Sequence, residues 1–150
     1  MEIDGQIVHI LAAHPTPPAF DGDEDRNGKR NHDEIRFWAD CIEGTDYICD
    51  DAGSYGGFGA EARHVILGDC NADPLDGDSR GGAIGQLLES PLLTASATDA
   101  EITPDGEDSP GNLGGANADH EGNPGFDTAD FGCNPSDPSA GAEPGNLRAD

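Results

Sequence analysis

Two polar clusters, each directly after a short apolar run, have side chains suited to phosphate chemistry. His14 follows Ile-Val-His-Ile-Leu-Ala-Ala, and Asp69 and Asn71 follow Val-Ile-Leu-Gly. Residues two apart in extended backbone project to the same side, so Asp69 and Asn71 are predicted to point together. A carboxylate and an amide placed in this way can hold a phosphate or a metal ion. The alternative is an ordinary polar strand exit over 68–74, because Gly, Asn, Asp and Pro are common turn residues.

The elements that must position these side chains follow from the apolar pattern. Residues 5–13 and 63–68 read as strands, and the β-branched run at 65–67 predicts a strand buried on both faces. Between them, a helix is predicted from an Asn31 cap, with Glu34 three residues later, to Gly44. Its apolar stripe consists of Ile35, Trp38, Ala39 and Ile42. A shorter helix is predicted over 81–90. This alternation indicates an α/β fold.

The prolines after His14 forbid a helix there and stiffen the chain that holds the imidazole. A single His at a strand end also has a structural interpretation, which the spacing alone leaves open. The region at about 99–146 is different in composition, being rich in Gly, Pro, Asp, Asn and Ser. Such a segment buries little apolar surface, so we expect it to be irregular.

The charge is strongly one-sided, with 31 Asp and Glu against 7 Lys and Arg and a formal net charge of -24. We therefore do not expect non-specific binding of nucleic acid through a basic surface, because counterion release needs cations at the phosphates. The acidity fits a high-salt environment, where screening weakens self-repulsion. An acidic surface that only aids solubility is the alternative.

The four cysteines form no Cys-x-x-Cys pair, which argues against a zinc site. A disulfide between two of them remains open for a secreted protein. No apolar run reaches the length of a membrane span, so we expect no membrane span. The first residues include Glu2 and Asp4 and do not follow a signal-peptide pattern.

One stretch matches the calcium-loop pattern D-x-[DN]-x-[DN]-G-x5-E. Asp23, Asp25, Asn27, Gly28 and Glu34 supply it in full. Against an EF-hand, the preceding stretch is rich in Pro and cannot form the entering helix, and Glu34 also suits a helix N3 position. Weaker binding of Ca²⁺ by this loop stays an alternative.

In combination, the motifs resemble the endonuclease/exonuclease/phosphatase superfamily, to which DNase I belongs. The resemblance rests first on Ile-Leu-Ala-Ala-His14-Pro and Val-Ile-Leu-Gly-Asp69-Cys-Asn71-Ala-Asp73, in this order with a helix between. Further motifs resemble a secreted bacterial or archaeal branch of this superfamily. They are His-Pro-Thr-Pro-Pro and the stretches at 76–79, 114–118, 127–131 and 145–150. Together these motifs extend over nearly the whole chain.

The resemblance implies a catalytic role for His14, Asp69, Asn71 and Asp150. His14 would contact the scissile phosphate, Asp69 would position or activate water, and Asn71 would hold phosphate or water. Asp150 would orient a second His. The implied cofactor is Mg²⁺, or Ca²⁺ or Mn²⁺, with Asp69 at the metal. His120, Asp127 and Asp130 lie in a family-like loop whose role the resemblance does not assign.

Departures from the family pattern define the rest of the hypothesis. This chain has no counterpart, at the matching places, of the family's metal-binding Asn and Glu or of its Asp-His pair. We therefore expect residues 1–150 to be a partial domain that lacks the first strands and the final strand. The expected fold is part of a DNase I-like four-layered α/β sandwich. The expected function is metal-dependent phosphoester hydrolysis, weak or absent in this chain. The expected substrate is a nucleic acid or a small phosphoester, and the parent protein is expected to be secreted.

Two further expectations complete the hypothesis. Open sheet edges are expected to favour association. The second function is non-enzymatic: an acidic Ca²⁺-binding module of a secreted protein, which uses the acidic loops at 21–34 and 73–78.

Overall fold

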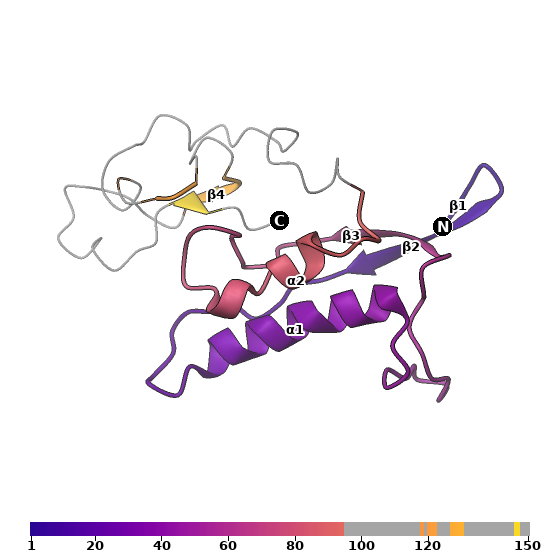
Figure 1. The fold of residues 1–150 in the computed structure, drawn as a ribbon, viewed down its shortest axis with the longest axis horizontal. Coiled ribbons are helices and arrows are strands. Elements are labelled where there is room, and N and C mark those ends of the chain that lie inside the picture. Colours follow the sequence, from indigo (N-terminus) through magenta and orange to yellow (C-terminus); the bar gives the residue numbers. More distant parts are fainter. Residues whose placement is uncertain (95–117, 119, 123–126, 131–145, 148–150) are drawn as a thin grey trace.

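The computed structural model describes residues 1–94, 118, 120–122, 127–130 and 146–147, and these form a mixed α/β structure. Its main sheet has three strands in the order β1-β2-β3, and two α-helices pack beside it (Figure 1). The predicted α/β class is therefore confirmed for this part of the chain. Asp150, one of the predicted catalytic residues, lies outside the described residues.

The sheet is built from a hairpin and a parallel crossover. β1 (Glu2–Ile3) pairs antiparallel with β2 (Gln6–Ala12), and the turn between them places Asp4 and Gly5 at φ 50° and 77°. Such paired positive angles match the twist of a two-residue hairpin. β2 then pairs parallel with β3 (Arg63–Leu67), from Val8 opposite Arg63 to Ala12 opposite Leu67. Both predicted strands are confirmed.

Helix α1 (Arg26–Glu43) connects the two parallel strands. It ends at Gly44, as predicted, with φ 79° and an N–H bonded back to the carbonyls of the last turn. The predicted start at Asn31 is wrong, because the helix begins five residues earlier. The carboxylate of Asp21 accepts the N–H groups of Asn27 and Gly28 at 2.6 and 3.0 Å, so a residue outside the helix satisfies its first turn.

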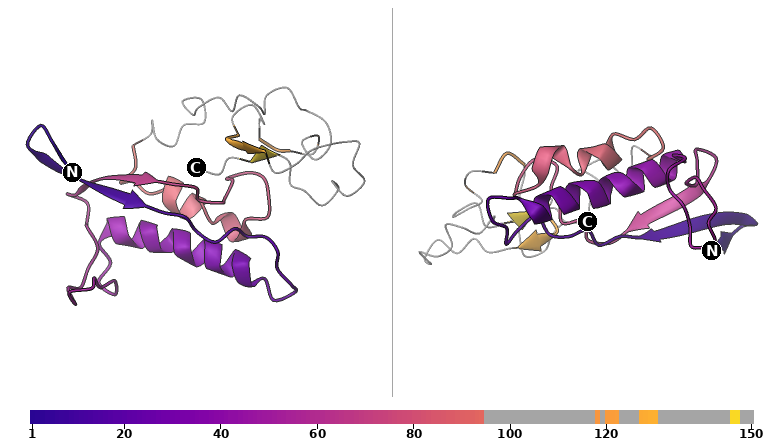
Figure 2. Two further views of the ribbon diagram at one scale, coloured as in Figure 1. Left: turned by 180° about the vertical axis from the view of Figure 1, so that it is seen from behind. Right: turned by 90° about the horizontal axis from the view of Figure 1, so that it is seen from below.

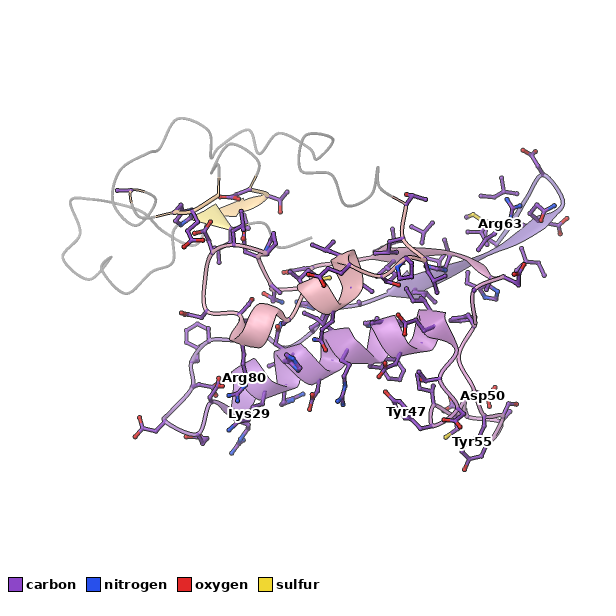
Figure 3. The ribbon with its side chains drawn as sticks, in the orientation of Figure 1. Lys29, Tyr47, Asp50, Tyr55, Arg63 and Arg80 are labelled. Atoms are coloured by element: carbon purple, nitrogen blue, oxygen red, sulfur yellow. The ribbon has the colours of Figure 1, made fainter. Side chains whose placement is uncertain are left out.

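The second helical region is shorter than predicted. In place of one helix over 81–90, a 3₁₀ turn η1 (Arg80–Gly82) precedes the short helix α2 (Gly85–Leu88). Gly81 and Gly82 have φ angles of 59° and 66°, which break the continuity. The guanidinium of Arg80 pairs with Asp25, so η1 is tied to the N-terminal end of α1 (Figure 3).

Both helices cover the same face of the sheet, as the view from below in Figure 2 shows. The core between them is apolar and consists of Leu11, Ile35, Ala39, Ile42, Cys70, Ala72, Ala83, Ile84 and Leu87. On the opposite face, Ile10, Val65 and Leu67 remain 42–49% exposed. The prediction that β3 is buried on both faces is therefore wrong, because the strand alternates between a covered side and an open one.

The end of the chain contributes a second, two-stranded sheet. β4 (Ala129–Asp130) pairs antiparallel with β5 (Asn146–Leu147). Leu147 packs against Gly77, where an added Cβ would lie 2.9 Å from its side chain. The small sheet thus lies beside the loop that follows β3 (Figure 1). Most of the region predicted to be irregular, at about 99–146, lies outside the described residues.

Among the described helices, none combines the length and the apolar character needed to cross a bilayer.

Gly68, the residue after β3, approaches β2 more closely than any side chain permits. Its φ is 133°, and a Cβ there would lie 1.9 Å from the carbonyl oxygen of Ala13. This φ lies in a region that only glycine adopts readily. Gly53 also has a positive φ, 80°, but nothing lies within 4 Å of a Cβ built on it.

We predict that Gly68→Ala lowers the free energy of unfolding by about 3 kcal/mol or more, from strain and steric overlap together. Urea denaturation followed by circular dichroism measures the change. Gly53→Ala is the matched control and should cost only about 1 kcal/mol, since it adds strain without overlap. Equal costs for the two variants would contradict the close approach at Gly68.

Candidate functional site at the strand ends

The carboxyl ends of β2 and β3 bring two predicted catalytic side chains together. Ala12 and Leu67 are partners in the parallel register, and the N–H of Ala13 donates to the carbonyl of Leu67 at 2.8 Å. The chain therefore leaves both strands at the same edge. His14 Nε2 and Asp69 Oδ2 lie 3.8 Å apart there, with side chains 72% and 47% exposed. A substrate in solvent can reach both.

Asn71 joins the two strand exits. Its side-chain Nδ2 donates to the carbonyl of Pro15 at 3.0 Å, and its backbone N–H donates to Asp69 Oδ1 at 2.8 Å. Its φ of 49° is one that Asn tolerates better than most residues. The predicted trio of His14, Asp69 and Asn71 is thus brought together. The structure shows that Asn71 links the two strand exits through hydrogen bonds. Contact between Asn71 and phosphate or water stays a prediction.

Asn31 is a residue of this site that the sequence pattern did not reveal. It is fully buried on α1, and its Nδ2 donates to the carbonyls of Cys70 and Asn71 at 3.0 and 3.2 Å. These bonds fix the backbone next to Asp69 against the helix. A signal was present, because Asn31 precedes Ile35 and Ala39 at four-residue spacing and so lies on the apolar stripe. A polar residue in that stripe marks a buried hydrogen-bonding position.

A shallow hollow of about 200 Å³ lies next to His14, between the end of β2 and the side of α1. It is lined by Ala12, Ala13, His14, Pro15, Glu34, Phe37 and Trp38. The Thr16 N–H donates to Glu34 Oε2 at 2.6 Å, and Arg30 donates to Glu34 Oε1 at 3.1 Å. Partial burial raises the pKa of Glu34, but the bonds from Thr16 and Arg30 outweigh it and hold the pKa below its usual value.

A larger hollow of about 420 Å³ runs along β3 and α2, and its lining is mostly apolar. His14 and Asp69 are not among its lining residues. It borders the strand end at Gly68 and Cys70, on either side of Asp69, without including the two polar side chains.

The residues of the calcium pattern do not form a loop. α1 begins at Arg26, so Asn27, Gly28 and Glu34 lie on the helix and not in a loop. Asp25 is paired with Arg80, and Glu34 is engaged by Thr16 and Arg30. Asp23 lies in the turn before the helix. Weaker Ca²⁺ binding by these residues stays a prediction.

The metal implied by the resemblance finds few ligands at the strand ends. Within the described residues, no three His, Cys, Asp or Glu side chains are arranged to hold a metal ion. At the site itself, Asp69 supplies one carboxylate, whose Oδ1 already accepts the N–H of Asn71. These residues do not fit a complete Mg²⁺ site, which needs near-octahedral oxygen coordination.

A second group of titratable side chains lies in the loop after β3 and its neighbours. His120 Nδ1 lies 3.9 Å from an oxygen of Asp76 and 3.9 Å from an oxygen of Asp127. The sequence pattern drew attention to His120 and Asp127 without assigning them a role. The side chain of Asp130, named with them, lies outside what the structure describes.

Comparison with known proteins gives no match. No protein-family model matches this chain, and neither does any curated protein or solved structure. The similarity to the endonuclease/exonuclease/phosphatase superfamily thus depends on the motifs alone.

We predict that Asn31→Ala lowers the free energy of unfolding by about 1 to 3 kcal/mol, because two carbonyls next to Asp69 lose their donor. Chemical denaturation measures this loss. NMR amide shifts of residues 69–71 should also move, as the loop is released from α1.

Asn27→Ala is the control for Asn31. Asn27 lies on the same helix and donates to the carbonyl of Ala19, away from the strand ends. This variant should leave the amide shifts of 69–71 unchanged. If both variants left those shifts unchanged, Asn31 would have no role in positioning the site.

Proposed function

We propose that the strand-end site belongs to a phosphoester hydrolase of the DNase I-like type and is incomplete in this chain. The observation that carries the proposal is the approach of His14 to Asp69, 3.8 Å apart and open to solvent where two parallel strands end. Ligand sites in α/β sheets commonly lie at this edge. The motifs that resemble the superfamily include both side chains.

The two side chains suit complementary steps of phosphoester hydrolysis. A protonated His14 donates to a phosphate oxygen, where negative charge develops in the transition state. Asp69 accepts a hydrogen bond from the attacking water and orients it. The distance of 3.8 Å between His14 Nε2 and Asp69 Oδ2 exceeds that of a direct hydrogen bond, so the two atoms are not hydrogen-bonded to each other. Asn71 and Asn31 keep the Asp69 backbone in place for this role.

The proposed site is weak or inactive by itself because its metal ligands are few. A bound Mg²⁺ would supply Lewis-acid stabilisation of the phosphate charge. The residues at the strand ends do not provide its coordination shell, so no step is assigned to it. The four-layered sandwich, the role of Asp150 and secretion of the parent protein are further parts of the proposal. A nucleic acid or a small phosphoester is the proposed substrate class.

Association through the sheet is also part of the proposal. The exposed side chains of Ile10, Val65 and Leu67 gather on one face, and β3 is the last strand in the sheet order. Such an edge favours pairing with another strand. The net charge of -24 opposes contact between copies at low salt, so association should increase with salt.

We predict that His14→Ala and Asp69→Ala each reduce hydrolysis of bis(p-nitrophenyl) phosphate by about 100-fold or more, since each removes a group that acts in the transition state. The assay is run with excess protein and Mg²⁺ or Mn²⁺, so that weak turnover is measurable.

His32→Ala and Asp51→Ala are the matched controls. His32 lies on α1 with its ring near Gly81, and Asp51 is exposed in the connection after α1, so neither is part of the strand-end trio. Both variants should retain the parent rate. Activity that survives both His14→Ala and Asp69→Ala would overturn the assignment.

A further inference from the structure

Helix α1 is hydrogen-bonded to both strand exits, which are residues 13–16 after β2 and residues 68–71 after β3. Asn31 donates to two carbonyls of the β3 exit. Glu34, three residues later on the helix, accepts the N–H of Thr16 in the β2 exit on Oε2 at 2.6 Å. Residues three apart on a helix lie on the same face. One face of α1 therefore holds the two exits through separate side chains.

The composition of the chain after His14 leaves α1 a single backbone donor to hold. Residues 15, 17 and 18 are prolines, and a proline has no N–H group. Thr16 is therefore the only residue of 15–18 whose backbone can donate a hydrogen bond, and Glu34 accepts it. Because Thr16 precedes a proline, its backbone also favours extended conformations. One acceptor on the helix can thus hold this stiff segment in place.

His14 lies between fixed neighbours although its own side chain is exposed. Ala13 and Pro15 are both buried, and the Ala13 N–H donates to a carbonyl of β3. The Pro15 carbonyl accepts a hydrogen bond from Asn71 Nδ2 at 3.0 Å. These two bonds link the β2 exit to the neighbouring strand and its exit, whereas the bond to Glu34 links it to the helix. The backbone around His14 is therefore held from two directions.

Glu34 is oriented for this contact. Arg30, one turn earlier on α1, donates to Oε1 at 3.1 Å, and Oε2 accepts the N–H of Thr16. Partial burial opposes ionisation, but the bonds from Thr16 and Arg30 keep the pKa of Glu34 below its usual value. The carboxylate is therefore ionised at neutral pH, and charge strengthens both hydrogen bonds. Glu34 also lines the hollow next to His14.

We propose that Glu34 is a positioning residue for His14: by holding Thr16 against α1, it sets where the imidazole lies relative to Asp69. The inference rests on the proposed function, in which His14 and Asp69 meet the same phosphate group. Without this acceptor, α1 loses its hydrogen bond to the β2 exit, and the imidazole is less restrained relative to Asp69. Displacement of a reacting group by about 1 Å can cost about 100-fold in rate, so such a loss matters to the site.

Glu34→Ala and Glu34→Gln separate the acceptor from the rest of the side chain. Alanine removes the acceptor, whereas glutamine keeps a carbonyl oxygen that can accept the Thr16 N–H. In the whole chain, the Thr16 amide should exchange with solvent about 10-fold faster in Glu34→Ala than in the parent, and Glu34→Gln should restore part of the protection. Equal exchange rates in the parent and in Glu34→Ala would overturn the proposal.

The position of His14 is measured by the NMR nuclear Overhauser effect between its ring and the methylene protons of Asp69. The parent chain should show this effect, because Nε2 and Oδ2 lie 3.8 Å apart. It should weaken in Glu34→Ala and recover in Glu34→Gln. Unchanged intensity in Glu34→Ala would overturn the proposal. This measurement needs no phosphate, so it tests the positioning of His14 independently of the proposed function.

Titration with inorganic phosphate then connects the position of His14 with binding. Glu34→Ala should weaken phosphate binding about 10-fold, as expected for the loss of one charged hydrogen bond, and Glu34→Gln should restore part of it. Phosphate binding that is equal in the parent and in Glu34→Ala would overturn the proposal. A parent chain that binds no phosphate would contradict the proposed function instead, and the Overhauser effect would then decide whether Glu34 positions His14.

Asp33→Ala is the matched control. Asp33 is an exposed carboxylate next to Glu34 on α1, and it pairs with His32 and Arg36, away from the β2 exit. This variant should match the parent in Thr16 exchange, in the Overhauser effect and in phosphate binding. An equal response to Asp33→Ala and Glu34→Ala would overturn the proposal, because the effect would then come from the charge of the helix and not from the contact with Thr16.

Discussion

The parallel pairing of β2 with β3 is the constraint on which the rest of the structure depends. The register ends with Ala12 opposite Leu67, and the bond from Ala13 to the carbonyl of Leu67 extends it by one residue. Gly68 then passes against Ala13 where no side chain fits. This contact brings the two strand exits together, so backbone geometry places His14 and Asp69 within reach of each other.

Local sequence patterns were sufficient for the two parallel strands and for the end of α1, and insufficient for what surrounds these elements. The apolar runs located both strands, and Gly44 located the end of α1, because each signal is carried by neighbouring residues. The start of α1 was missed because Asp21, outside the helix, satisfies its first N–H groups. The exposed face of β3 was missed because Val65 and Leu67 are apolar whether or not something covers them.

The candidate site shows the same division. Parallel topology predicts that His14 and Asp69 meet, since both follow strands joined by a single helix. Asn31 and the group of Asp76, His120 and Asp127 depend on contacts between residues about 40 or more positions apart, such as Asn31 with Cys70 and Asp76 with Glu121. No local spacing encodes such contacts. Their physical signature is burial: Asn31 is fully buried, and His120 and Asp127 are nearly so.

The central claim is that the strand ends form a phosphate-binding site, and binding can be measured even where turnover is too slow to detect. The most direct measurement is a titration of the ¹⁵N-labelled chain with inorganic phosphate, with and without Mg²⁺, followed by amide and His side-chain shifts. The account predicts that changes concentrate at His14 and at residues 69–71, and that they disappear in His14→Ala. Unchanged signals at His14 and residues 69–71, or changes spread evenly over the described residues, would contradict a phosphate-binding site at the strand ends.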